Sequence, residues 1–179
     1  MAIIQSSLIL ALAGAAAAAA TAKYPEVKPG PGLPSLAELG ITSAELYQMG
    51  KPAFHSNAIN GAFSANLDPG CGPSDAYTYD INGVIVCYNY LAKLGDTACV
   101  VPAEGYSAFC TSGDAAITGK SQLSGSGTSS ACRDVANGVL WVLDHCTRNE
   151  EGNVAGFQAA YGNGDLKVSV SNVEFASRT

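Results

Sequence analysis

Basic side chains are scarce in this sequence, and those present are scattered. Nine lysines and arginines stand against fifteen aspartates and glutamates, which gives a net charge of −6 at pH 7. Nucleic-acid binding depends on clustered Lys and Arg side chains that contact phosphates. We therefore expect neither a nucleic acid nor an anionic membrane surface as a partner.

The common signatures of catalytic and metal sites are missing as well. The sequence has no G-x-S-x-G, H-E-x-x-H, phosphate-binding loop or calcium-binding loop, and no C-x-x-C pair. Of its two histidines, we interpret His55 as a surface residue and His145 as a favourable partner for the C-terminal end of a helix dipole. We predict no catalytic residue, no cofactor and no metal ligand.

Paired carboxylates, which glycoside hydrolysis requires across a cleft, are also sparse. The only close sets are Asp75 with Asp80 and Glu150 with Glu151, and both lie in polar, turn-like stretches. We interpret them as solvated surface. A small extracellular hydrolase with an unrecognised carboxylate site is retained as one alternative.

The first 22 residues contain no charged side chain. A short apolar run continues there into an alanine stretch and ends Ala20-Thr21-Ala22, which is the pattern of a secretory signal peptide. A membrane anchor is the alternative, but alanine is only mildly apolar and no basic cluster follows. We predict that residues 1–22 are removed on export, and that the mature chain is secreted and has no membrane span.

Every cysteine follows this segment. An even number of cysteines in a small exported chain indicates disulfides, here three, and spacing alone leaves fifteen pairings open. The six cysteines are Cys71, Cys87, Cys99, Cys110, Cys132 and Cys146.

The strongest periodic pattern is an amphipathic helix over residues 130–146. Ser129 and Ser130 are suited to cap its N-terminus, and Asp134 lies in its first turn. Cys132 and Cys146 lie on nearly the same face but about 21 Å apart along the axis, so they cannot bond to each other. Each must connect one end of the helix to another element, for which we expect the sheet or the first helix, and twelve pairings are left.

The N-terminal part of the mature chain is expected to differ from the rest. Residues 23–53 are expected to form a proline-rich arm that begins with an extended linker over 23–34. Short helices are expected to follow, beginning at capping boxes on Ser35 and Thr42. Whether this arm docks on the rest of the protein is left open. Residues 54–179 are expected to form a disulfide-stabilised domain.

Within that domain, residues 84–94 carry apolar side chains at helical spacing, and Gly95 follows as a C-terminal stop. We expect a helix there, although the Val84-Ile85-Val86 run favours a strand. A strand is also expected near residues 62–67. Five further strands are expected at residues 97–101, 106–111, 115–119, 154–161 and 165–171.

Two pairs of these strands are expected to form hairpins. Cys99 and Cys110 are equidistant from the Glu104-Gly105 turn and can therefore face each other across the first. Asn163-Gly164 between apolar runs indicates the second, and residues 121–130 are expected to be a polar loop. The element order predicts an α+β fold, in which an antiparallel sheet carries two helices on one face and disulfides staple the sandwich.

The second half of the chain also shows a series of short motifs. They are Ala98-Cys99, Ala108-Phe109-Cys110, a Gly/Ser loop before Ala131-Cys132-Arg133-Asp134, Asp144-His145-Cys146, and a strand that begins Gly164-Asp165-Leu166-Lys167. Together they resemble two groups of small secreted cysteine-rich fungal proteins, the killer toxins and the necrosis-inducing effectors of plant-associated fungi. The resemblance implies a disulfide-held α/β sandwich and a toxin or virulence role, and it assigns no functional residue.

We therefore expect a non-enzymatic secreted effector or killer-toxin-like protein that acts on host or competitor cells. Its target would be an extracellular protein or glycan of unknown identity. A carbohydrate- or cell-wall-binding module is a further alternative, with Trp141, Tyr77, Tyr79 and Tyr90 as candidate contact residues. Trp141 lies opposite the apolar stripe of its helix, where it is either half-exposed or covered by a loop.

Overall fold

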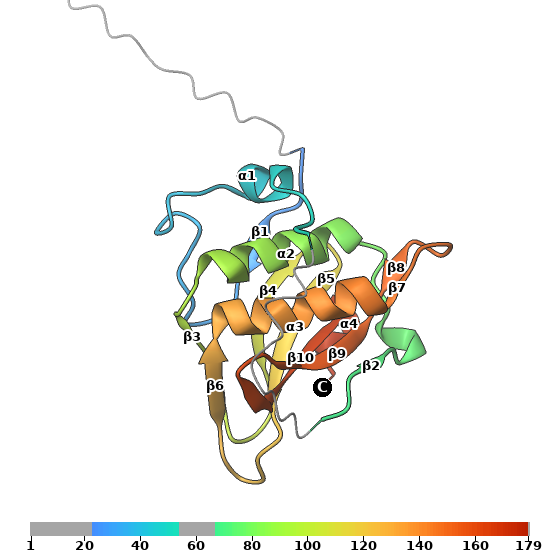
Figure 1. Cartoon of the computed structure of the whole chain (residues 1–179). Coiled ribbons are helices and arrows are strands. Elements are labelled where there is room, and N and C mark those ends of the chain that lie inside the picture. The colour runs from blue at the N-terminus through green and yellow to red at the C-terminus, as the bar shows by residue number, and fades with distance from the viewer. Residues whose placement is uncertain (1–22, 54–66, 179) are drawn as a thin grey trace, which may run out of the picture.

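The computed structural model describes residues 23–53 and 67–178. The predicted signal segment, His55 and nearly all of the strand expected near 62–67 lie outside these ranges. Helices α2 (Ile81–Lys93) and α3 (Cys132–His145) lie side by side on one face of an antiparallel sheet (Figure 1). The predicted α+β sandwich is therefore confirmed.

The main sheet has six strands in the order β1-β4-β5-β10-β9-β2, and all neighbours are antiparallel. Two separate two-stranded ribbons, β3–β6 and β7–β8, accompany it in the described part of the chain. The strands are β1 (Val27–Pro29), β2 (Gly70–Cys71), β3 (Ala98–Val101), β4 (Ser107–Ser112), β5 (Ala115–Ser121), β6 (Thr128–Ala131), β7 (Thr147–Arg148), β8 (Asn153–Val154), β9 (Gly156–Ala160) and β10 (Asn163–Asn172). The described residues also form the short helices α1 (Ser43–Gln48) and α4 (Val173–Ala176) and the 3₁₀ helix η2 (Ser74–Ala76).

Helix α2 forms in a segment where the spacing of apolar residues predicts a helix but the β-branched run favours a strand. Asp80 caps its N-terminus by accepting a hydrogen bond from the Gly83 amide at 2.8 Å. After the helix, Gly95 adopts a φ of +56°, a conformation that side chains other than glycine resist. Val84 and Val86, which lie between this cap and Gly95 in the sequence, are completely buried. Burial of the apolar face therefore outweighs the local strand preference of the β-branched run.

Helix α3 is confirmed, but it begins differently from the expectation. Ser129 and Ser130 lie in β6 rather than at the cap, and Ala131 takes the N-cap position without a side-chain hydrogen bond. The first two helical amides instead donate to the backbone carbonyls of Thr97 and Gly95, at 2.9 and 3.0 Å. The turn after α2 thus satisfies donors that a capping side chain usually satisfies.

The strand pairing predicted for the first hairpin is wrong. Strand β3 pairs with β6, whereas β4 pairs with β5 and β1, so the end of the expected loop 121–130 is a strand. Equal spacing about a turn brings two cysteines together only if their strands pair, and here Cys99 and Cys110 have other partners. The β9–β10 hairpin is confirmed, with Asn163 already paired to Ala160.

Each of the three disulfides connects a helix to a strand. Cys87 in α2 bonds to Cys110 in β4, Cys99 in β3 bonds to Cys132 at the start of α3, and Cys71 in β2 bonds to Cys146 at the end of α3. The prediction that Cys132 and Cys146 do not bond to each other is confirmed. The partner of Cys146 lies in the main sheet as expected, whereas the partner of Cys132 lies in the β3–β6 ribbon.

The N-terminal arm docks on the domain. Val27 is buried and pairs with Ser112, so the stretch expected to be a linker supplies an edge strand of the main sheet. The proline that ends β1 is tolerated because an edge strand needs few backbone donors. Helix α1 begins at the predicted Thr42 capping box and packs against α2.

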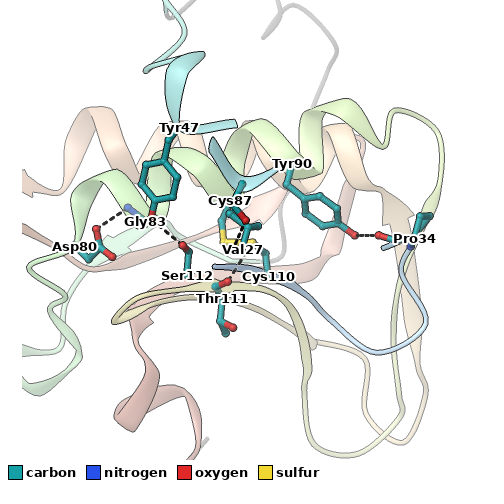
Figure 2. The surroundings of a disulfide bond; sticks show 11 residues. Val27, Pro34, Tyr47, Asp80, Gly83, Cys87, Tyr90, Cys110, Thr111 and Ser112 are labelled. Atoms are coloured by element: carbon teal, nitrogen blue, oxygen red, sulfur yellow. Dashed lines mark hydrogen bonds between the residues drawn. A yellow bond between two sulfur atoms is a disulfide. The ribbon is translucent and has the colours of Figure 1, made fainter. Parts of the chain in front are cut away.

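Two tyrosines hold this arm in place on the two sides of the Cys87–Cys110 disulfide (Figure 2). The Tyr47 and Ser112 hydroxyls are 2.8 Å apart, and the Tyr90 hydroxyl donates to the Pro34 carbonyl at 2.7 Å. Burial, together with the charge of Glu38, raises the pKa of Tyr90 to about 12.

We predict that Tyr90→Phe changes how stability depends on alkaline pH. An unfolded tyrosine titrates near pH 10, so the folded state binds the Tyr90 proton more tightly. Its contribution to the free energy of unfolding is full below about pH 10 and is lost as the pH rises toward 12. Because the variant lacks the hydrogen bond to Pro34, its free energy of unfolding at pH 7 should be lower by about 1 kcal/mol. Above pH 10, however, its stability should fall less steeply than that of the parent protein. Urea unfolding across this range checks the slope, and an unchanged slope contradicts the argument.

We also predict that the Cys71–Cys146 disulfide is the first to open in mild reductant. Cys71 is exposed, whereas the four cysteines of the other two disulfides are completely buried. Thiol–disulfide exchange requires access to a sulfur atom. Limited reduction, alkylation and peptide mass mapping should therefore label Cys71 and Cys146 first. Earlier labelling of Cys87 and Cys110 would show that exposure does not control the order.

Candidate functional site

The face of the main sheet opposite α2 and α3 carries a pocket. Val168 in β10 faces α3, since a Cβ added at Gly138 would lie 3.4 Å from its side chain. The neighbouring Lys167 and Ser169 therefore point to the other face, because side chains alternate along a strand. There they line a cavity of about 160 Å³, which also includes Phe175 of α4. We call this cavity the sheet pocket.

Two lysines lie opposite each other in the sheet pocket. Lys167 of β10 is in register with Lys120 of β5. Directly opposed side chains in antiparallel strands have Cβ atoms about 4.5–5.5 Å apart, and like charges in that arrangement repel. Within residues 23–53 and 67–178, neither lysine forms an ion pair with an acidic side chain. The pocket therefore concentrates positive charge on a protein whose net charge is −6.

Lys167 is the more enclosed of the two lysines. It is partly buried, whereas Lys120 is exposed. The Lys167 Nζ lies 4.5 Å from the centroid of the Phe157 ring, within the range of a cation–π interaction. Burial, and secondarily the charge of Lys120, lowers the pKa of Lys167 below its ordinary value.

The remaining lining combines hydroxyl groups with aromatic and other apolar surface. Ser169 is in register with both Thr118 and Phe157, so these three side chains share the outer face. Tyr106 also lines the pocket and is, with the two lysines, one of three titratable residues in the described part of its lining. No carboxylate is among the described residues that line the pocket. This arrangement can bind an anion and an apolar ring, and it offers no acid/base pair of carboxylates.

The tyrosines predicted for binding do not gather at this pocket. Tyr90 is completely buried beneath the N-terminal arm, whereas Tyr79 is 74% exposed. The Tyr77 ring is covered by the guanidinium of Arg148, which lies 3.6 Å from its centroid. The three tyrosines therefore do not form one exposed row.

Trp141 and His145 form a separate pair on α3. The indole is partly buried, and the rings stack with centroids 4.3 Å apart and an interplanar angle of 9°. The His145 Nδ1 is 2.8 Å from the Trp141 carbonyl oxygen. His145 thus lies in the last turn of the helix, where it was predicted.

The carboxylates considered for hydrolysis lie elsewhere in the fold. Asp80 caps α2, and the exposed Asp75 pairs with Arg178 at 3.3 Å. Glu150 and Glu151 are exposed in the turn between β7 and β8. None of these four carboxylates lines the sheet pocket.

Residues 23–53 and 67–178 contain no group of three or more His, Cys, Asp or Glu side chains suited to a metal ion. No helix in the same part of the chain is long and apolar enough to cross a membrane.

Sequence reasoning missed the lysine pair, although part of its signal was present. The strand predicted over residues 165–171 includes Lys167. Lys120 lies one residue beyond the strand expected at 115–119, and only the register of β5 against β10 brings the two together.

A family model described as a domain of unknown function (DUF8794) matches residues 70–172. The match runs from the start of β2 to the end of β10 and includes all six cysteines and both lysines of the sheet pocket. No curated protein and no solved structure matches the chain.

We predict that Lys120→Gln raises the pKa of Lys167. The substitution removes the opposing positive charge but leaves the burial of Lys167 in place, so the pKa recovers only part of its shift. NMR titration of the lysine side chains measures this change directly. Lys93→Gln, which removes an exposed charge from α2, is the matched control and should leave the Lys167 titration unaltered. A Lys167 pKa that is the same in both variants would exclude the coupling.

Proposed function

The chain belongs to the DUF8794 family, and we propose that it is a secreted, non-enzymatic effector or killer-toxin-like protein that acts on host or competitor cells by binding an extracellular target. Its three disulfides support export, because such bonds persist in oxidising compartments. The pattern of residues 1–22 supports the same route. The disulfide-stapled sandwich also agrees with the architecture that the resemblance to fungal toxins and effectors implies.

The chemistry of the sheet pocket carries this proposal. The pocket offers ammonium and hydroxyl groups for binding, from Lys120, Lys167, Thr118 and Ser169. The described residues that line it include no carboxylate pair with which to cleave a glycosidic bond. These groups lie on neighbouring strands of a sheet that disulfides attach to α2 and α3. Groups held on a rigid scaffold lose little conformational entropy when they bind. These features support action by contact with a target.

We predict that purified, oxidised residues 23–179 cause a measurable response when applied to plant tissue or to competing fungal cells. The readouts are ion leakage or necrosis in tissue, and growth inhibition in cells. Reduced and alkylated protein is the control and should be inactive, because each lost disulfide removes about 2–5 kcal/mol of stability. If neither tissue nor cells respond while a glycan array or a hydrolase substrate panel does, the effector proposal is wrong.

A further inference from the structure

The sheet pocket has the dimensions of a site for a single ring. Its volume is about 160 Å³, and a cavity of about 150 Å³ lined by apolar side chains is large enough to bind benzene. Phe157 and Phe175 supply aromatic surface, and Pro73 and Ala76 supply further apolar surface. A ligand that fills this space would bury a ring-sized apolar body.

The two lysines add a requirement for negative charge. Lys120 and Lys167 are directly opposed, and neither forms an ion pair with an acidic side chain in the described ranges. An anionic group between them would replace a repulsive contact by two charge-assisted hydrogen bonds. Thr118 and Ser169 form the next pair on the same face, two residues along each strand, and their hydroxyls offer further hydrogen bonds.

We propose that the sheet pocket binds a ring-sized organic monocarboxylate, with its ring against Phe157 and Phe175 and its carboxylate between Lys120 and Lys167. This inference rests on the proposed binding role of the pocket and names the ligand class. A bare inorganic anion would use the lysines but leave the apolar surface exposed to water. A neutral ring would cover the apolar surface but leave the two like charges opposed.

Benzoate is the probe that tests this assignment. Calorimetric titration of the oxidised protein at pH 7 should show saturable binding of benzoate. Benzamide, which has the same shape without the charge, and inorganic phosphate, which has the charge without the ring, should each bind at least about tenfold more weakly. Chemical-shift changes should be confined to residues that line the pocket.

Variants separate the charge from the shape of the site. The double variant Lys120→Gln/Lys167→Gln removes the opposed charges and should bind benzoate at least about tenfold more weakly, with benzamide binding unchanged. Lys93→Gln changes the net charge without touching the pocket and should bind like the parent. Phe157→Leu keeps the lysines but reduces the aromatic surface, and it should weaken benzoate and benzamide alike. The amide NMR spectrum of each variant reports whether its fold is retained.

Three outcomes would overturn the assignment. They are no benzoate binding at about 10 mM ligand, equal affinity for benzoate and benzamide, and phosphate binding as tight as benzoate binding. Failure of the effector proposal is distinguishable from all three, because it appears in tissue and cell assays rather than in the titration. Benzoate binding by a protein that provokes no cellular response would leave the pocket assignment intact.

Discussion

The disulfide between Cys87 and Cys110 is the constraint on which the rest of this fold depends. It joins the middle of α2 to β4, and both cysteines are completely buried. Helix α2 in turn contacts α1, α3, β1, β4 and β5. The disulfide therefore fixes the position of α2, the helix that these five elements contact. Figure 2 shows the contacts of the N-terminal arm on the two sides of this disulfide.

Because α2 and α3 cover one face of the main sheet, they determine which side chains of β5 and β10 are left for the opposite face. The inner side chains of β5 and β10 are committed to the core, where Ile117, Leu166 and Val168 are completely buried. Alternation along the same strands then sends Lys120 and Lys167 to the outer face. Helix α4 contacts β5, β10 and η2 there and contributes Phe175 to the sheet pocket. One strand pair thus serves both the core and the candidate binding site.

Local patterns in the sequence predicted the features that depend on near neighbours. Helical spacing located α2 and α3, the length of α3 excluded a bond between its two cysteines, and Asn163-Gly164 between apolar runs located the β9–β10 hairpin. Each of these follows from contacts within one element or across one turn.

The features that sequence reasoning missed depend on distant pairings. Strand β3 pairs with β6 rather than with the strand that follows it, which changes the partners of Cys99 and Cys110. The lysine pair exists only because β5 and β10, far apart in sequence, align in one particular register. A single sequence carries no local signal for such a register, so neither the disulfide partners nor the pocket was predictable from it.

The stability of the double variant Cys87→Ala/Cys110→Ala tests the central structural claim most directly. Its free energy of unfolding in urea, with the other two disulfides intact, should be lower by about 3 kcal/mol or more. Loss of the cross-link accounts for about 3 kcal/mol of this, and the smaller buried side chains add to the loss. A decrease of less than about 1 kcal/mol would show instead that packing alone fixes the position of α2.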